Sequence, residues 1–96
     1  MARSYLSLGD AIQAFLKKYN LKDEADIQKV ILEWEQLMGK PIAQRTDKLY
    51  LRGKTFCVHI PDPVWRQELQ MARGKIKDTI NRRVGRTLVE DVRILA

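Results

Sequence analysis

Residues that build catalytic and metal sites are scarce in this sequence. Its 96 residues include one cysteine, Cys57, and one histidine, His59. One cysteine cannot form a disulfide within the chain, and with one histidine it is too small a set of ligands for a zinc framework. Most acid–base and nucleophilic mechanisms also need a histidine or an activated thiol with partners around it. We therefore expect no enzyme activity, no metal and no cofactor.

Long apolar runs are also missing. No stretch approaches the roughly 18–20 apolar residues that span a bilayer, and residues 1–5 lack the apolar core of a signal peptide. The chain has 45% hydrophobic and 31% charged residues with five Gly and three Pro, which is an ordinary globular composition. It is also too short for two domains. We expect one soluble, cytoplasmic domain over residues 1–96, with no membrane and no small-molecule substrate.

Basic residues outnumber acidic ones, and the excess is unevenly placed. Eighteen Lys and Arg against twelve Asp and Glu give a formal charge of +6. Residues 1–39 carry five basic and six acidic residues, residues 40–63 carry five and two, and residues 64–96 carry eight and four. A localised basic excess is typical of proteins that bind a polyanion, although many proteins need such charge only for solubility.

Hydrophobic periodicity predicts two helices in the first half of the chain. An approximate capping box at residues 7–10 and apolar residues at helical spacing indicate a first helix over 8–20. A second helix has acidic residues near its start and runs to Met38, where Gly39 and Pro41 end it. The segment that follows, 41–47, is expected to be a short connection.

The second half of the sequence alternates between strand and helix patterns. Residues 49–60 predict a β-hairpin with its turn at 52–54, followed by a long helix that Asp62 caps and that runs to about Val84. Residues 87–95 then predict a strand, with Val89 facing away from the core. The order α-α-β-β-α-β predicts an α+β fold, a three-stranded sheet with helices on one face.

Two features of the helices concern packing. Large apolar residues at helical spacing are usually buried, which predicts a structural core that includes Trp34, Trp65, Leu69, Ile76 and Ile80. Gly74 lies inside the long helix, where glycine costs about 1 kcal/mol relative to alanine. We expect a close approach of backbone to explain it.

The long helix also carries the densest group of cations. A wheel at 100° per residue places them on both flanks of the apolar stripe: Arg66, Arg73 and Lys77 on one, and Lys75, Arg82 and Arg86 on the other. Arg83 falls near the centre of the stripe, so either the helix has frayed there or the side chain reaches solvent, an acid or a ligand. The flanks are either basic rails that meet phosphates or the solvated sides of an amphipathic helix.

The hairpin offers a second candidate surface. If its leucines and Phe56 face the core, then Tyr50, Arg52, Cys57 and His59 share the open face of the sheet, beside Arg93. An aromatic ring with arginines suits base stacking and phosphate neutralisation, although both residue types are common on solvated strands. Cys57 beside His59 also resembles a metal or thiol–imidazole pair, but no further ligand or orienting group is near in sequence.

These residues form a pattern that resembles the DciA-like family of small bacterial proteins. The pattern runs from about Leu8 to the end of the chain. Its pieces are Trp34-Glu35-Gln36-Leu37-Met38-Gly39, Leu49-Tyr50-Leu51-Arg52-Gly53, Val58-His59-Ile60, Val64-Trp65-Arg66-Gln67-Glu68-Leu69, Asn81 and Val84-Gly85. The most specific are the tryptophan five residues before a glycine and the Trp-x-x-Glu-Leu start of the long helix.

The resemblance implies a K-homology-like fold and a role beside the replicative helicase, as a loader that binds single-stranded DNA. The Gly-x-x-Gly loop with which K-homology domains clamp nucleotides is absent from this sequence, so binding by that route is not implied. Our leading hypothesis is a non-catalytic accessory protein of DNA replication. An RNA-binding module and an adapter that binds only protein are the alternatives. The candidate nucleic-acid-binding residues are Arg66, Arg73, Lys77, Lys75, Arg82, Arg83, Arg86, Arg52, Lys54 and Tyr50.

Overall fold

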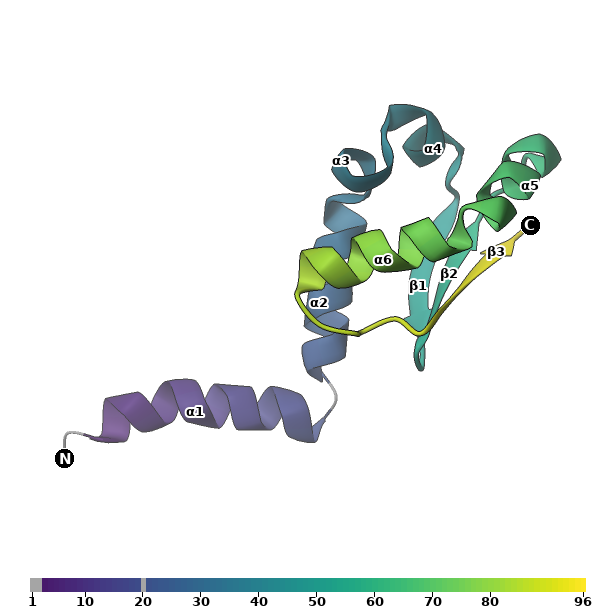
Figure 1. The fold of residues 1–96 in the computed structure, drawn as a ribbon. Coiled ribbons are helices and arrows are strands. Elements are labelled where there is room, and N and C mark those ends of the chain that lie inside the picture. Colours follow the sequence, from purple (N-terminus) through teal and green to yellow (C-terminus); the bar gives the residue numbers. More distant parts are fainter. Residues whose placement is uncertain (1–2, 20) are drawn as a thin grey trace.

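The computed structural model of the chain describes the backbone of residues 3–19 and 21–96 and the side chains of residues 8–19 and 21–96. Helices followed by the order β-β-α-β confirm the α+β class (Figure 1). The elements are α1 (Arg3–Lys18), α2 (Leu21–Leu32), α3 (Trp34–Met38), α4 (Lys40–Arg45), β1 (Lys48–Arg52), β2 (Thr55–His59), α5 (Pro63–Met71), α6 (Arg73–Val84) and β3 (Asp91–Leu95).

The three strands form one sheet in the order β1-β2-β3. β1 and β2 pair antiparallel, as the hairpin prediction requires, with Gly53 at φ +62° in the turn between them. β3 pairs parallel to β2, so the chain must cross over through α5 and α6 to reach it. Figure 1 shows α2 and α6 crossing the same side of the sheet, which leaves the other side open.

The core lies between this sheet and the helices. As predicted, the core buries Trp34, Leu69, Ile76 and Ile80. The centroid of the Trp34 ring lies 5.7 Å from the centroid of the Phe56 ring. The Trp34 indole N–H donates to the Thr46 hydroxyl at 3.0 Å, so the buried ring keeps a polar partner. Trp65 is only half-buried, with the Arg45 guanidinium 4.6 Å from its ring centroid.

The first half of the chain differs from the prediction in three ways. α1 begins at Arg3, so residues 7–10 lie inside the helix and do not cap it. The second helix is not continuous: it turns at Glu33, and α3 then ends at Gly39, whose φ is +92°. The expected connection contains α4, because Pro41 is well suited to the first turn of a helix and starts one here. Asn20, the expected end of the first helix, lies outside the described residues.

The predicted long helix is two helices. The Asp62 carboxylate caps the first, accepting from the Val64 amide at 2.9 Å as predicted, but the backbone bends at Ala72 (φ −101°, ψ 8°). The bend lies two residues before Gly74, a poor helix former. A Cβ at Gly74 would meet nothing within 4 Å, so the expectation of a close backbone approach there is wrong.

The chain between α6 and β3 is held by one side chain. Gly85, at φ +84°, ends α6 as predicted. The Asn81 Oδ1 then accepts from the amides of Leu88 and Val89 at 3.0 and 2.8 Å, and its Nδ2 donates to the Val89 carbonyl at 2.9 Å. This bracing turns both side chains into the core, so Val89 is fully buried and its predicted outward orientation is wrong. The strand itself begins only at Asp91.

Candidate nucleic-acid interface

Arg83 points from α6 to the turn between α2 and α3. Its guanidinium binds both carboxylate oxygens of Glu33, with 2.8 Å between Nη2 and Oε1. The hydrogen bond from Arg83 holds the pKa of the Glu33 carboxyl below its ordinary value, and the same bond raises the pKa of Arg83. The sequence left open whether Arg83 reaches solvent, an acid or a ligand, and the structure shows that it contacts an acid.

Arg86 makes a second bridge to α2. Its Nη2 lies 2.7 Å from the Asp23 carboxylate and 2.8 Å from that of Asp26, and its Nε donates to Asp26 at 3.1 Å. The hydrogen bonds that Arg86 donates to Asp23 and to Asp26 raise the pKa of Arg86. Lys54, in the hairpin turn, also lies 4.0 Å from Asp23. The acidic start of α2 therefore binds cations from two other parts of the fold.

The Arg66 side chain binds the backbone at the end of β2. Its Nη1 donates to the carbonyls of Ile60 at 2.8 Å and Pro61 at 3.1 Å, where the chain leaves β2. Because the backbone bends at Ala72 between α5 and α6, one helical wheel does not relate Arg66 to Arg73 and Lys77. The single continuous helix from which that flank was predicted is therefore not present.

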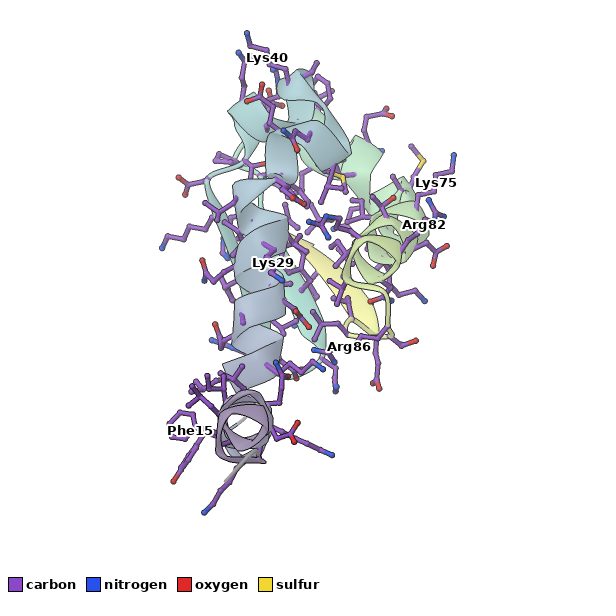
Figure 2. All side chains as sticks on the ribbon, turned by 90° about the vertical axis from the view of Figure 1, so that its left-hand side faces the viewer. Phe15, Lys29, Lys40, Lys75, Arg82 and Arg86 are labelled. Carbon is purple, nitrogen blue, oxygen red and sulfur yellow. The ribbon has the colours of Figure 1, made fainter. Side chains whose placement is uncertain are left out.

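Three exposed cations of α6 have no acidic partner among the described side chains. We call Arg73, Lys75 and Arg82 the outer cations, because all three side chains are exposed. Figure 2 shows Lys75 and Arg82 on the side of α6 away from α2, whereas Arg73, the first residue of α6, falls on the other flank of the helix wheel. Among the described side chains, none of the three has a carboxylate oxygen within 4.0 Å, although Asp78 lies on the same helix. Lys77 is half-buried and likewise makes no ion pair within the described part of the chain.

The open face of the sheet holds a second group of polar side chains. The strand register places Tyr50 beside Cys57 and Cys57 beside Arg93, as predicted. The Tyr50 hydroxyl lies 3.0 Å from the His59 Nε2, whose ring is also bonded through Nδ1 to the Ala96 oxygen at 3.0 Å. Tyr50, Arg52 and Arg93 line a small hollow on this face.

Cys57 and His59 lie two residues apart on β2 and so share this face of the sheet. Cys57 is buried, and both His59 nitrogens are engaged by other groups, so the two residues do not form a thiol–imidazole pair. Within residues 8–19 and 21–96, no three His, Cys, Asp or Glu side chains are arranged to hold a metal ion. Arg93 was not among the predicted binding residues, yet its alternation along the edge strand β3 places it on this face, beside Cys57.

One further property concerns the helices as a whole. Across the described residues, none of them combines the length and the apolar character that crossing a bilayer requires.

Comparison with known proteins identifies a family for the chain. The profile of the family described as "Dna[CI] antecedent, DciA" matches residues 7–94, nearly the whole sequence. Neither a search of curated proteins nor one of solved structures found a match. The resemblance seen in the sequence is thus confirmed, and the chain belongs to the DciA family, a bacterial family of helicase-loader type whose role is accessory to DNA replication.

Proposed function

We propose that this protein binds single-stranded DNA through the outer cations of α6 and associates with the replicative helicase. The observation that carries the DNA half is that Arg73, Lys75 and Arg82 are exposed and have no acidic partner among the described side chains, whereas Arg83 and Arg86 are bound by acids of the protein itself. Free cations on one helix can neutralise phosphates and release their counterions, which is the main source of affinity for a polyanion.

Of the ten residues predicted to bind nucleic acid, those with structural partners are weaker candidates. A phosphate would have to compete with Glu33 for Arg83 and with two aspartates for Arg86. We therefore place the contact on the outer cations, with the half-buried Lys77 at their margin. Tyr50 and Arg52 lie on the open face of the sheet, which would serve as a separate surface for stacked bases.

The test is single-stranded DNA binding measured against salt. Each phosphate contact with a single strand contributes about −0.7 to the slope of log K against log salt, so three contacts give a slope of about −2. The triple variant Arg73→Gln, Lys75→Gln and Arg82→Gln should bring the slope close to zero. A variant with Arg52→Gln and Arg93→Gln is the matched control on the sheet.

The outcomes separate the two surfaces and the DNA proposal itself. If the α6 triple variant keeps the salt dependence of DNA binding and the Arg52 and Arg93 variant loses it, the DNA contacts the sheet and not α6. No binding at low salt, or a slope near zero for the unchanged protein, would contradict DNA binding. Competition between DNA and RNA strands of the same sequence tests the RNA alternative, because a protein selects RNA through its 2′-hydroxyl.

Helicase association is supported by the helicase-loader type of the family. It is tested by mixing the purified chain with the replicative helicase of the same cells and following co-elution in gel filtration. Co-elution by a chain that has no affinity for DNA would favour the adapter that binds only protein.

A further inference from the structure

The apolar stripe of α1 is left in solvent. Leu8, Ile12, Phe15 and Tyr19 follow one another at spacings of four, three and four residues and therefore lie on one face of the helix. Their exposed fractions are 64, 52, 55 and 56%. Figure 1 shows α1 extending away from the sheet and helices and meeting them only near the start of α2. The expected packing of this helix on the sheet is therefore not observed.

The rest of the protein does not need this stripe. Every residue of the buried core cluster comes from Ile27 or later in the chain, and the sheet and its helices are complete without α1. A helix of 16 residues is marginal in water by itself and gains most of its stability by packing an amphipathic face. A contiguous exposed apolar surface of this kind typically marks a site of interaction.

Charge beside the stripe indicates what covers it. Lys17, Lys18 and Lys22 are exposed near the C-terminal end of α1, and Asp10 is the only acidic residue before Asp23. The Lys18 ammonium lies 5.6 Å from the centroid of the Tyr19 ring, so a cation flanks the stripe itself. A partner surface that accepts this helix would have apolar walls and an acidic rim.

A second copy of the chain fits the stripe less well. Pairing α1 with another α1 would cover only these half-exposed side chains, about 400–500 Å² on each copy, whereas a stable interface buries roughly 800 Å² per partner. A groove encloses a helix on both sides and also covers its flanks. Docking of an amphipathic helix through anchors at such spacings is a common mode of recognition between proteins.

We infer that α1 is a docking helix whose Leu8–Tyr19 stripe enters an apolar, acidic-rimmed groove of the replicative helicase. This inference rests on the helicase association proposed above and specifies the surface that makes it. DNA and helicase then occupy different parts of the protein, since the outer cations belong to α6.

The experiment compares helicase affinity for the full chain and two variants, by anisotropy of a labelled chain titrated with helicase. In Ile12→Asp with Phe15→Asp, the stripe is broken, and we expect affinity to fall at least 30-fold. Thermal unfolding of the core, followed by tryptophan fluorescence, should not change, because the described residues of α1 contribute nothing to the buried core. In Lys17→Glu with Lys18→Glu, affinity should fall about tenfold and depend less on salt.

A matched control separates this surface from the DNA contact. Lys75→Glu with Arg82→Glu should leave helicase affinity within threefold of the unchanged protein while weakening DNA binding. Equal helicase binding by the unchanged chain and the stripe variant would overturn the docking helix and leave helicase association standing. No binding by the unchanged chain would overturn both.

Two measurements on the free chain test the other occupants of the stripe. A dimer in sedimentation at micromolar concentration that Phe15→Asp dissociates would show that a second copy covers it. Slow hydrogen exchange of the α1 amides in the free monomer would show that the protein covers its own stripe. Either result overturns the inference; a monomer with fast exchange in α1 that slows on adding helicase supports it.

Discussion

Both sides of α6 carry polar and basic residues, but within the described part of the chain only those on the inner side bind other parts of the fold. On the inner side, Asn81 and Arg83 fasten the helix to the β3 approach and to the turn after α2. On the outer side, Lys75 and Arg82 have no acidic partner among the described residues. Pairing, and not the number of cations, therefore decides which positive charges are free to meet a ligand. Net charge alone cannot make this distinction.

The largest expected difference between the sides is in stability at Asn81. Asn81→Ala removes three hydrogen bonds to Leu88 and Val89, whose side chains are fully buried. Because buried amides left without a partner cost about 1–3 kcal/mol each, we expect the free energy of unfolding to fall by about 2–4 kcal/mol. Urea unfolding followed by tryptophan fluorescence measures it.

The neighbouring residue gives the matched control for Asn81. Arg82 lies on the outer side, so Arg82→Ala should change the free energy of unfolding by no more than about 0.5 kcal/mol. Asn81→Asp keeps the acceptors for two amides but loses the donor to the Val89 carbonyl, so its cost should be smaller than that of alanine. Equal costs for Asn81→Ala and Arg82→Ala would remove the distinction between the sides.

A smaller effect is expected from breaking the Arg86 bridge. Arg86→Ala removes three charge-assisted hydrogen bonds to Asp23 and Asp26, and the Arg86 side chain is one-third exposed. Solvent screens such a pair, so we expect a loss of about 1–2 kcal/mol, less than the sum for three buried bonds. Thermal unfolding at low and high salt measures it, and the loss should shrink in 1 M salt. A loss independent of salt would indicate packing instead of charge.

The parts of the fold that local pattern encodes were predictable from the sequence. The hairpin turn at Gly53, the Asp62 cap and the Gly85 stop each depend on a few adjacent residues, and all three are confirmed. The breaks at Glu33 and Ala72 were not predictable, because neither residue is a strong helix breaker. The apolar periodicity continues through both bends and therefore does not mark them.

The sequence predicted which residues lie at the candidate site, but it did not predict which of them form ion pairs. The wheel identified the cations of α6, and strand alternation identified the face that holds Tyr50 and Arg93. Which cations are neutralised depends on contacts such as Arg83 with Glu33, fifty residues apart in the chain. The position of α1 was not predictable for a similar reason. An amphipathic pattern predicts that one face of a helix is buried, but it does not indicate which molecule buries that face.

A smaller and opposite effect on stability is expected at Gly74, where the surroundings are open. Gly74→Ala places a methyl group where nothing lies within 4 Å, near the start of α6. Because alanine restricts the unfolded chain more than glycine, we expect the free energy of unfolding to rise by about 0.5–1 kcal/mol. Urea unfolding checks the sign. Destabilisation would mean that the backbone at Gly74 is needed, as the sequence first suggested.

The smallest effect concerns the pH dependence of the inner side. Arg83 lowers the pKa of Glu33 from its ordinary value of 4.5, so near that pH the folded chain binds fewer protons than the unfolded chain. The stabilisation is therefore complete above pH 4.5 and is lost as the pH falls through the lowered pKa. Because this pair is exposed, the effect on the midpoint of thermal unfolding should be small and should weaken with salt.

Glu33→Gln tests the pair directly by removing the titrating carboxyl. The unchanged protein should unfold at a higher temperature than the variant at pH 7, and the gap should close as the pH approaches 3. In an Arg83→Ala background, the same substitution should produce no gap at either pH, since the partner that lowers the pKa is gone. A gap that stays constant from pH 7 to pH 3 would show that Glu33 stabilises the fold by something other than its charge, and the contrast between paired and free cations on α6 would lose its clearest case.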